Sequence, residues 1–181
     1  RNPLGIVNGY AELLLEDKAG FSEDHLSFIS SIHAAGNKML KIIDDILSLQ
    51  RIETMQTGKH KNELEFTALV RDVFESNRIR AKQKSQTYEL SVPDQPVIAP
   101  ADVAQVREAM ENLITNAIKY TPLGGKVEVR LTLQQRYLVF EVEDTGLGIP
   151  EDQQARLFQP FFRASNAYAA QIEGTGLGLH L

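Results

Sequence analysis

The chain has 181 residues, of which 43% are hydrophobic and 24% charged, a composition typical of globular domains with a buried core. Its net charge is −5 and its 19 lysines and arginines are scattered, which argues against nucleic acid as a main partner. It contains no cysteine, so disulfides and thiolate metal sites are excluded and a cytoplasmic setting fits.

No apolar run approaches the roughly 20 residues that cross a bilayer, so we expect no membrane contact by this part of the protein. The chain begins at Arg1 without methionine and stops at Leu181 inside a glycine-rich motif. We therefore interpret it as a fragment, and a membrane anchor elsewhere in the full-length protein stays open.

The first part of the chain, to about Thr57, has a helical period throughout. A polar interruption at 16–24 separates two helices, and Ser22 can cap the second, which runs from about Glu23 to Ile52. That helix carries two neighbouring apolar stripes: Leu26, Ile29, Leu40, Ile43 and Leu47 in one, and Phe28, Ile32, Met39, Ile42, Ile46 and Leu49 in the other. One partner helix cannot cover both, so we expect two hairpins to pair as a dimeric four-helix bundle. The alternative is that the second stripe packs on the rest of the same chain.

The second part has a mixed period. It predicts strands near 64–67, 88–93, 126–133 and 137–144 and helices at about 68–83 and 102–120. This order predicts an α/β layer with one mixed sheet and helices on one face. The whole chain is then α+β, with a helical domain at 1–57 and an α/β domain at 58–181.

The helix at 101–122 carries a candidate site. Its predicted core stripe is Val106, Met110, Leu113, Ile114 and Ala117, and its opposite face is Glu108, Asn112, Asn116, Lys119 and Tyr120. Amide oxygens suit a Mg²⁺ ion that shares phosphate oxygens, and a lysine one turn further on can neutralise those phosphates. The alternative is an ordinary solvated helix face.

A second candidate is the segment "EVEDTGLGIP", 141–150, in which a strand ends at Asp144 beside two glycines. The spacing of a dinucleotide fingerprint and the lysine of a P-loop are both missing. A buried carboxylate here could accept a hydrogen bond from the exocyclic amine of adenine and would repel the carbonyl of guanine. Gly146 and Gly148 would let the backbone approach the base closely. The alternative is a turn with an incidental acid.

A third candidate is "EGTGLGLHL", 173–181, whose glycines at 174, 176 and 178 leave backbone N–H groups free to meet phosphate at a helix start. Between the two glycine motifs lies "LFQPFFR", 157–163, followed by small and polar residues at 164–173. That run predicts a mobile lid over a nucleotide.

The order of these four motifs resembles the ATP-binding domain of two-component sensor histidine kinases, within the gyrase, chaperone and mismatch-repair ATPase superfamily, where they are called the N, G1, F and G2 boxes. The opening "RNPL", 1–4, resembles the end of the family's phospho-acceptor motif His-Glu-x-Arg-Asn-Pro. The resemblance covers nearly the whole chain and implies a sandwich-type ATP-binding domain after the dimerisation helices.

The resemblance also implies roles for matching residues. Asn116 would hold Mg²⁺ with support from Asn112, and Asp144 would bind the adenine amine. The other implied nucleotide contacts are Lys119, Tyr120, Gly146, Gly148, Arg163, Gly174, Thr175, Gly176, Leu177 and Gly178.

The implied activity is ATP-dependent phosphorylation of a histidine just upstream of Arg1, followed by transfer to an aspartate of a response regulator. Hydrolases of the superfamily carry a glutamate one turn before the metal asparagine, where this chain has Asn112, which cannot act as a general base. None of the four histidines, His25, His33, His60 and His180, stands in the acceptor motif. Asn2 matches the position that orients a water in members with phosphatase activity. The alternatives are an ATP hydrolase of the superfamily and a non-catalytic dimeric nucleotide-binding scaffold.

Overall fold

The structure is a computed structural model that describes residues 2–17, 20–54, 61–170, 172 and 174–180. Its chain divides into two compact units, Arg1–Met55 and Gln56–His180, which we describe separately. Among the helices of the described residues, none is both long and apolar enough to cross a membrane.

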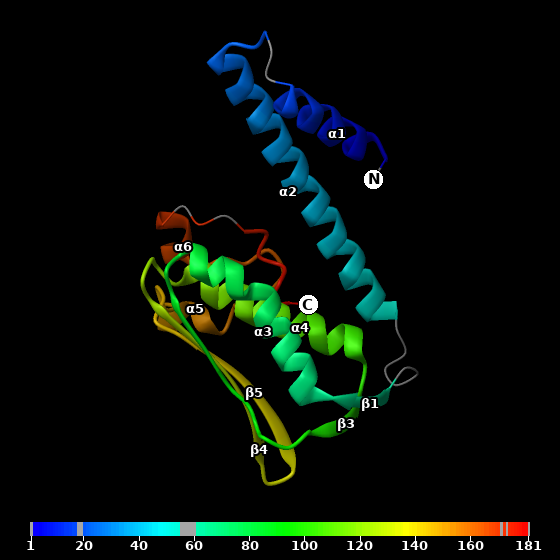
Figure 1. The fold of residues 1–181 in the computed structure, drawn as a ribbon, viewed down its shortest axis with the longest axis vertical. Coiled ribbons are helices and arrows are strands. Elements are labelled where there is room, and N and C mark those ends of the chain that lie inside the picture. Colours follow the sequence, from blue (N-terminus) through cyan, green and yellow to red (C-terminus); the bar gives the residue numbers. More distant parts are fainter. Residues whose placement is uncertain (1, 18–19, 55–60, 171, 173, 181) are drawn as a thin grey trace. The chain divides into compact units, whose positions relative to one another are not determined.

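The first unit is a helical hairpin of α1 (Asn2–Glu16) and α2 (Glu23–Thr54) (Figure 1). The start of α2 is capped as the sequence predicts, because Ser22 Oγ accepts a hydrogen bond from the N–H of His25 at 3.3 Å. The two apolar stripes of α2 differ in burial. The first, at Leu26, Ile29, Leu40, Ile43 and Leu47, is half-buried, whereas Phe28, Ile32 and Met39 of the second are 64%, 51% and 48% exposed. Ile42 of the second stripe is half-buried, and the side chains of Ile46 and Leu49 lie outside the described residues.

The two helices are joined by a polar contact. Asn8 of α1 is 7% exposed and donates a hydrogen bond from Nδ2 to Asn37 Oδ1 at 2.5 Å. Its Oδ1 lies over Gly36 of α2, where a Cβ would come within 2.0 Å of that oxygen. The missing side chain of Gly36 therefore allows Asn8 to be buried between the helices.

The second unit contains nine elements among the described residues. They are β1 (Asn62–Glu65), α3 (Phe66–Gln83), β2 (Thr87–Ser91), β3 (Ile98–Ala101), α4 (Val103–Tyr120), β4 (Lys126–Gln134), β5 (Tyr137–Asp144), α5 (Glu151–Gln154) and α6 (Ser165–Ala169). Strand β4 pairs in parallel with β2 and antiparallel with β5. Strands β1 and β3 form a separate antiparallel pair. The prediction of one mixed sheet was therefore wrong, because β3, with Pro100 and no polar–apolar alternation, gave no strand signal.

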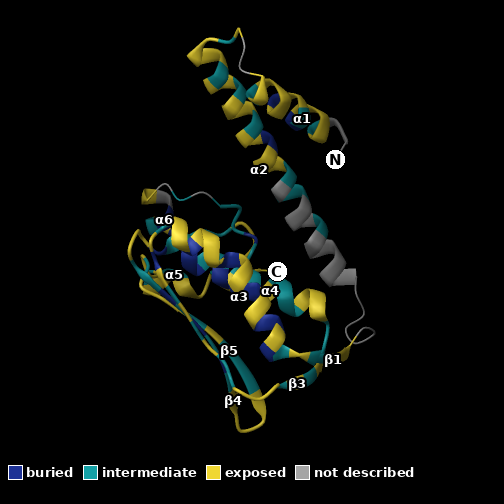
Figure 2. Ribbon diagram, viewed as in Figure 1, coloured by how far each residue is buried: buried dark blue, intermediate teal, exposed yellow. Residues whose placement is uncertain are grey.

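Helices α3 and α4 cover one face of the three-stranded sheet, and the core lies between these helices and the sheet (Figures 1 and 2). Its fully buried members include Val70, Val73, Ile114, Val127, Val129 and Leu131. Leu113, which the sequence placed in the core stripe, is 38% exposed. The stripe of α4 is centred on Met110, Ile114 and Ile118, one turn apart, and Leu113 falls at its edge.

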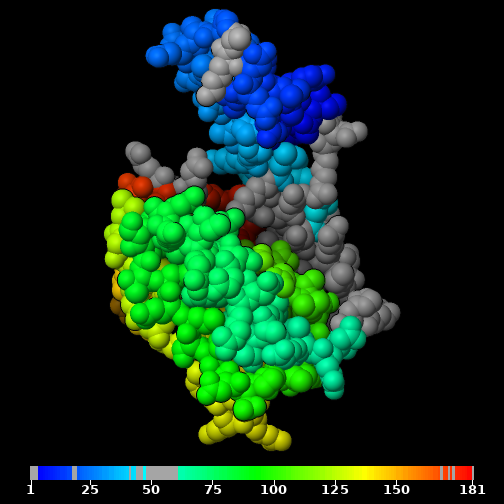
Figure 3. Space-filling model, in the orientation of Figure 1, coloured from blue at the N-terminus to red at the C-terminus, as the bar shows by residue number. Residues whose placement is uncertain are grey.

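The end of the sheet formed by the β4–β5 turn reaches beyond the helices. The β4–β5 hairpin projects from the body of the α/β unit, where it is drawn in yellow at the lower end (Figure 3). Leu133 and Tyr137 near its tip are 62% and 73% exposed. The segment that the sequence analysis predicted to bind the base follows the other end of β5, which is Asp144.

Candidate nucleotide site

Helix α4 is held in place by its N-cap and its core stripe. Asp102 Oδ1 accepts hydrogen bonds from the backbone N–H groups of Ala104 and Gln105 at 2.9 and 3.2 Å. With its apolar residues facing the sheet, the helix turns its polar face away from the core. The four predicted site residues on that face are half-buried: Asn112, Asn116, Lys119 and Tyr120.

The register of the sheet determines the side on which Asp144 lies. Asp144 is paired with Val127, whose side chain is fully buried under the helices, and directly paired residues share one face. Asp144 therefore lies on the helix side of β5. It is nevertheless exposed, contrary to the buried acceptor that the selectivity argument assumed, and its Oδ1 accepts a hydrogen bond from the N–H of Gly146 at 2.8 Å.

The turn after Asp144 packs on the end of α4. The carbonyl of Tyr120 accepts a hydrogen bond from the N–H of Leu147 at 3.3 Å. A Cβ on Gly146 would lie 2.8 Å from that same carbonyl oxygen, so a side chain there would separate the turn from the helix. Gly148 has a φ of +62°, which favours glycine.

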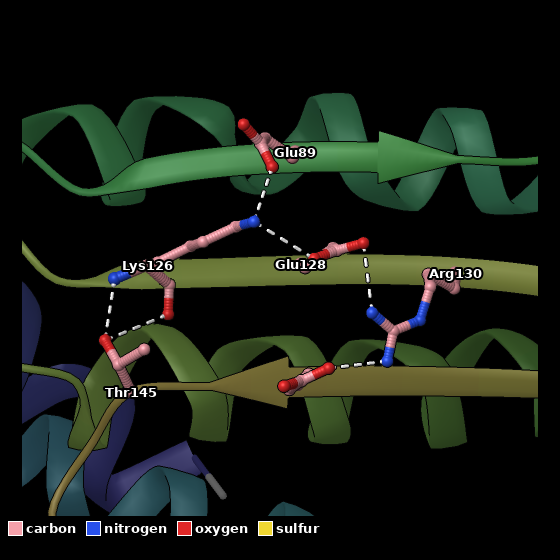
Figure 4. Close-up of polar contacts among 6 residues, drawn as sticks. Glu89, Lys126, Glu128, Arg130 and Thr145 are labelled. Atoms are coloured by element: carbon pink, nitrogen blue, oxygen red, sulfur yellow. Dashed lines mark hydrogen bonds and ion pairs between the residues drawn. The ribbon is translucent and has the colours of Figure 1, made fainter.

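The same turn is attached to the sheet through Thr145 (Figure 4). The N–H of Thr145 donates to the carbonyl of Lys126 at 3.0 Å, and the N–H of Lys126 donates to Thr145 Oγ1 at 2.9 Å. The base-binding candidate Asp144 is thus followed by a residue fixed to β4. The sequence analysis missed Thr145, although a hydroxyl directly after a strand-end acid is a recognisable turn signal.

Charged side chains link the three strands on the face away from the helices (Figure 4). Lys126 Nζ lies 2.8 Å from Glu89 and 3.1 Å from Glu128, and Arg130 pairs with Glu128 at 3.0 Å and with Glu143 at 2.6 Å. Hydrogen bonds, first to Glu89 and then to Glu128, raise the pKa of Lys126. Hydrogen bonds from Lys126 and Arg130 lower the pKa of Glu128. Because these groups are solvated, we expect the network to contribute little stability.

The second glycine motif, which contains Gly174, Gly176 and Gly178, lies against the polar face of α4. A Cβ on Gly174 would lie 2.6 Å from Lys119 Nζ, 3.6 Å from Tyr120 Oη and 3.8 Å from Arg163 Nε. A Cβ on Gly178 would lie 3.3 Å from Asn112 Oδ1. The glycine motif and α4, more than fifty residues apart in the chain, therefore meet here. The motif presents only glycine backbone to the polar side chains of the helix.

The amide of Asn112 indicates that this junction can accept a polar ligand. Its Nδ2 atom is buried and has no hydrogen-bond partner among the described residues. Lys119 Nζ lies 4.8 Å from the ring centre of Tyr120, at the same junction. Amide oxygens, an ammonium group and a glycine backbone form a donor set that fits a nucleotide phosphate with a hard cation such as Mg²⁺.

Gly176 connects this motif to the "LFQPFFR" segment. Its φ is +76°, and a Cβ would lie 2.7 Å from the carbonyl carbon of Phe161. Phe161 itself has a φ of +64°, an unusual conformation for an aromatic residue. Two further residues were predicted to contact nucleotide, Thr175 and Leu177. The side chain of Leu177 is fully buried, and Thr175 Oγ1 accepts a hydrogen bond from the N–H of Leu177 at 3.4 Å.

The predicted lid contains the short helix α6. Asn166 on this helix donates from Nδ2 to the carbonyls of Leu147 and Gly148 at 3.2 and 2.9 Å, so the lid segment contacts the turn after Asp144. Arg163 donates from Nη2 to the carbonyl of Ile172. The sequence analysis did not single out Asn166, because its partners lie in a turn that is distant in the chain and adjacent only in space.

Two predicted residues are not joined to the others by these contacts. Asn116 is half-buried on the same face of α4 as Asn112, one turn later. Asn2 begins α1, and its side chain lies outside the described residues.

Comparisons with known proteins agree with the two units. Residues 101–181 match the family described as "Histidine kinase-, DNA gyrase B-, and HSP90-like ATPase", and residues 1–54 match the "His Kinase A (phospho-acceptor) domain". The chain belongs to the sensor histidine kinases. It combines a phospho-acceptor domain with an ATP-binding domain of the gyrase and chaperone superfamily.

Curated relatives of this histidine kinase chain match it from end to end. The circadian input-output histidine kinase CikA of Synechococcus elongatus is 32% identical over the whole chain, which spans 24% of that protein. The non-motile and phage-resistance protein of Caulobacter vibrioides is 31% identical, and the chain spans 22% of it. The chain therefore spans about a quarter of these relatives.

Solved structures of histidine kinases share its fold. Full-length ShkA in complex with AMPPNP is 26% identical, with a TM-score of 0.76 over 99% of this chain and 37% of that one. The mycobacterial sensor histidine kinase MprB is 28% identical, with a TM-score of 0.55 over 67% of this chain and 74% of that one. The α+β fold class predicted from the sequence is thus confirmed.

Proposed function

We propose that the protein is a histidine kinase that uses Mg²⁺-ATP to phosphorylate a histidine immediately upstream of Arg1 and then transfers the phosphoryl group to an aspartate of a response regulator. The observation that carries this proposal is the meeting of Gly174 and Gly178 with Lys119 and Asn112. It brings the backbone of two glycines close to an ammonium group and an amide, and groups of these kinds bind phosphates.

Each motif has a part in binding. Asp144, on the helix side of β5, selects adenine through its amine, and Gly146 and Gly148 allow the base to approach the backbone. Lys119, Tyr120 and Arg163 surround Gly174 and neutralise or hydrogen-bond the phosphates. Asn116, with Asn112 one turn before it, holds Mg²⁺, which supplies further charge neutralisation at the phosphates when bound.

The residue at position 112 favours transfer to protein over hydrolysis. An amide cannot remove a proton from water, so this chain has no general base at position 112, where the hydrolases of the superfamily carry a glutamate. The histidine acceptor then acts as nucleophile, and the task of α4 and the glycine motifs is to hold the phosphates in line with it.

The exposed stripe of α2 supports a homodimer. Phe28, Ile32 and Met39 are exposed apolar residues at steps of four and seven, on one face of the helix, which a second hairpin would bury. The response regulator is proposed from the family alone, through the phospho-acceptor domain at residues 1–54.

The decisive experiment uses a chain extended upstream through the acceptor motif and incubated with labelled Mg²⁺-ATP. Acid-labile, base-stable label on the protein is the expected result and indicates phosphohistidine. Released phosphate without labelled protein would indicate a hydrolase instead, and nucleotide binding without either product would indicate a scaffold.

We also propose that Asn2 orients the water that removes phosphate from the response regulator. In the extended protein, Asn2→Ala should leave histidine phosphorylation unchanged and lower the rate of regulator dephosphorylation. The two rates are measured separately with labelled protein and labelled regulator. Dephosphorylation at the normal rate would remove this role.

A further inference from the structure

One lysine from outside the helix binds three carbonyls at the carboxyl end of α4. The last carbonyls of a helix have no partner within it and need donors from elsewhere. Lys84, just after α3, donates from Nζ to the carbonyls of Ile118, Lys119 and Thr121 at 2.8, 2.9 and 2.5 Å. Three N–H groups of one ammonium thus meet three carbonyls of one helix end.

Other donors from outside α4 reach this end as well, two of them at carbonyls that Lys84 also binds and one at the carbonyl of Tyr120. Gln86, which is buried, donates from Nε2 to the carbonyls of Ile118 and Thr121 at 3.0 and 2.8 Å. The carbonyl of Tyr120 accepts from the turn after Asp144. Each carbonyl from residue 118 to residue 121 therefore has a donor from outside α4.

A cation is suited to this place for a second reason. The carbonyl end of a helix carries a partial negative charge, which a lysine ammonium compensates. A neutral replacement of Lys84 would leave the carbonyl of Lys119 without the donor described here, and the last helical turn would lose the group that ties its successive carbonyls together.

The residues tied down in this way carry the phosphate-binding side chains. The backbone of Lys119 is bonded to Lys84, while its side chain reaches Gly174 together with that of Tyr120. A change in the last turn of α4 would therefore displace the ammonium and phenol groups from the phosphate site. The turn with Asp144 depends less on this contact, because Thr145 is bonded to β4.

We propose that Lys84 is a positioning residue for the phosphate end of the nucleotide, acting through the backbone of Lys119 and the last turn of α4. This inference rests on the proposed function of the site as an ATP site. An ordinary helix cap would affect stability and would weaken the binding of every part of the nucleotide alike, whereas Lys84 is proposed to affect the phosphate end.

The test compares ATP with adenosine, which lacks the phosphates. In the full chain, Lys84→Met should weaken Mg²⁺-ATP binding about tenfold, as expected for one misplaced charge-assisted hydrogen bond, and change adenosine binding less than about twofold. Calorimetry gives the ATP affinity, and amide shifts in an NMR titration give the adenosine affinity. Shift changes in the free variant should be concentrated at residues 117–122.

Lys82→Met is the matched control, because Lys82 is an exposed lysine two residues earlier on α3. It should bind both ligands as the unaltered chain does. If Lys84→Met unfolds the domain, Lys84→Gln, which keeps two N–H donors, should still show a loss confined to ATP. Equal losses for ATP and adenosine, or unchanged ATP binding, would overturn the inference. Failure of the unaltered chain to bind ATP would instead refute the proposed function.

Discussion

At the scale of the residue, the glycines of the second glycine motif differ in what surrounds them. Gly174 faces the end of the flexible Lys119 side chain, whereas Gly176 has a positive φ and faces the backbone of Phe161. A side chain can move and a packed backbone cannot move as easily. The two positions therefore provide a matched pair of substitutions.

We expect Gly176→Ala to destabilise the ATP-binding unit by about 1–3 kcal/mol, because alanine is strained at that φ and its Cβ meets the backbone. Gly174→Ala should change the free energy of unfolding by less than about 0.5 kcal/mol but weaken ATP binding, since Lys119 must move. Urea unfolding and calorimetry measure the two effects. Equal effects of the two variants on stability would contradict this description of the motif.

Asp144 gives a prediction about the base. Asp144→Asn keeps an oxygen that can accept from Gly146 but removes the negative charge and adds an amide that can donate to the carbonyl of guanine. We expect the preference for ATP over GTP to fall at least about tenfold, measured by calorimetry with both nucleotides. An unchanged preference would show that Asp144 does not select the base.

At the scale of the element, the hairpin of α1 and α2 depends on the absence of a side chain at Gly36. Gly36→Ala should destabilise the helical unit by about 1–3 kcal/mol, because its Cβ overlaps the buried Asn8. The control is Gly9→Ala in α1, where a Cβ meets nothing within 4 Å and helix propensity predicts a gain of up to about 1 kcal/mol.

Thermal unfolding measured by circular dichroism compares these variants. Adding Asn8→Ala to Gly36→Ala should recover most of the lost stability, since the overlapping amide is gone. A double variant no more stable than Gly36→Ala alone would place the cost elsewhere in the hairpin.

Elements with a clear period could be predicted from the sequence, and those formed by context could not. Helices α1 and α2 follow from their apolar period and from the cap at Ser22, and strands β4 and β5 follow from the alternation of polar and apolar residues. Strand β3 exists because β1 pairs with it, and nothing in "IAPA" signals that pairing. Leu113 is a second example. Its helical period placed it in the core, but the packing of α4 on the sheet leaves it partly exposed.

The site was predictable as a set of residues but not as a set of contacts. Helical spacing placed Asn112 and Lys119 on one face, and the glycines are visible as letters. That Gly174 and Gly178 would lie on these two residues is a property of the tertiary fold, as is the carbonyl cluster held by Lys84, which no local pattern marks.

At the scale of the whole molecule, the exposed stripe of α2 predicts association. Ile32→Glu should raise the dimer dissociation constant at least about tenfold, because burial of an isoleucine side chain contributes roughly 1.5–3 kcal/mol. Sedimentation of the chain over a range of concentrations measures it. Ser30→Glu, on an exposed polar position of the same helix, is the control, and equal behaviour of the two variants would contradict the proposed interface.

The contacts of Lys84 and Gln86 with the end of α4 have an evolutionary consequence. Lys84 and Gln86 lie between the two stretches that match the kinase families, residues 1–54 and 101–181, and belong to neither. If Lys84 has the proposed positioning role, substitutions accumulating in this stretch during evolution will alter the affinity for ATP while every residue of the family motifs remains unchanged.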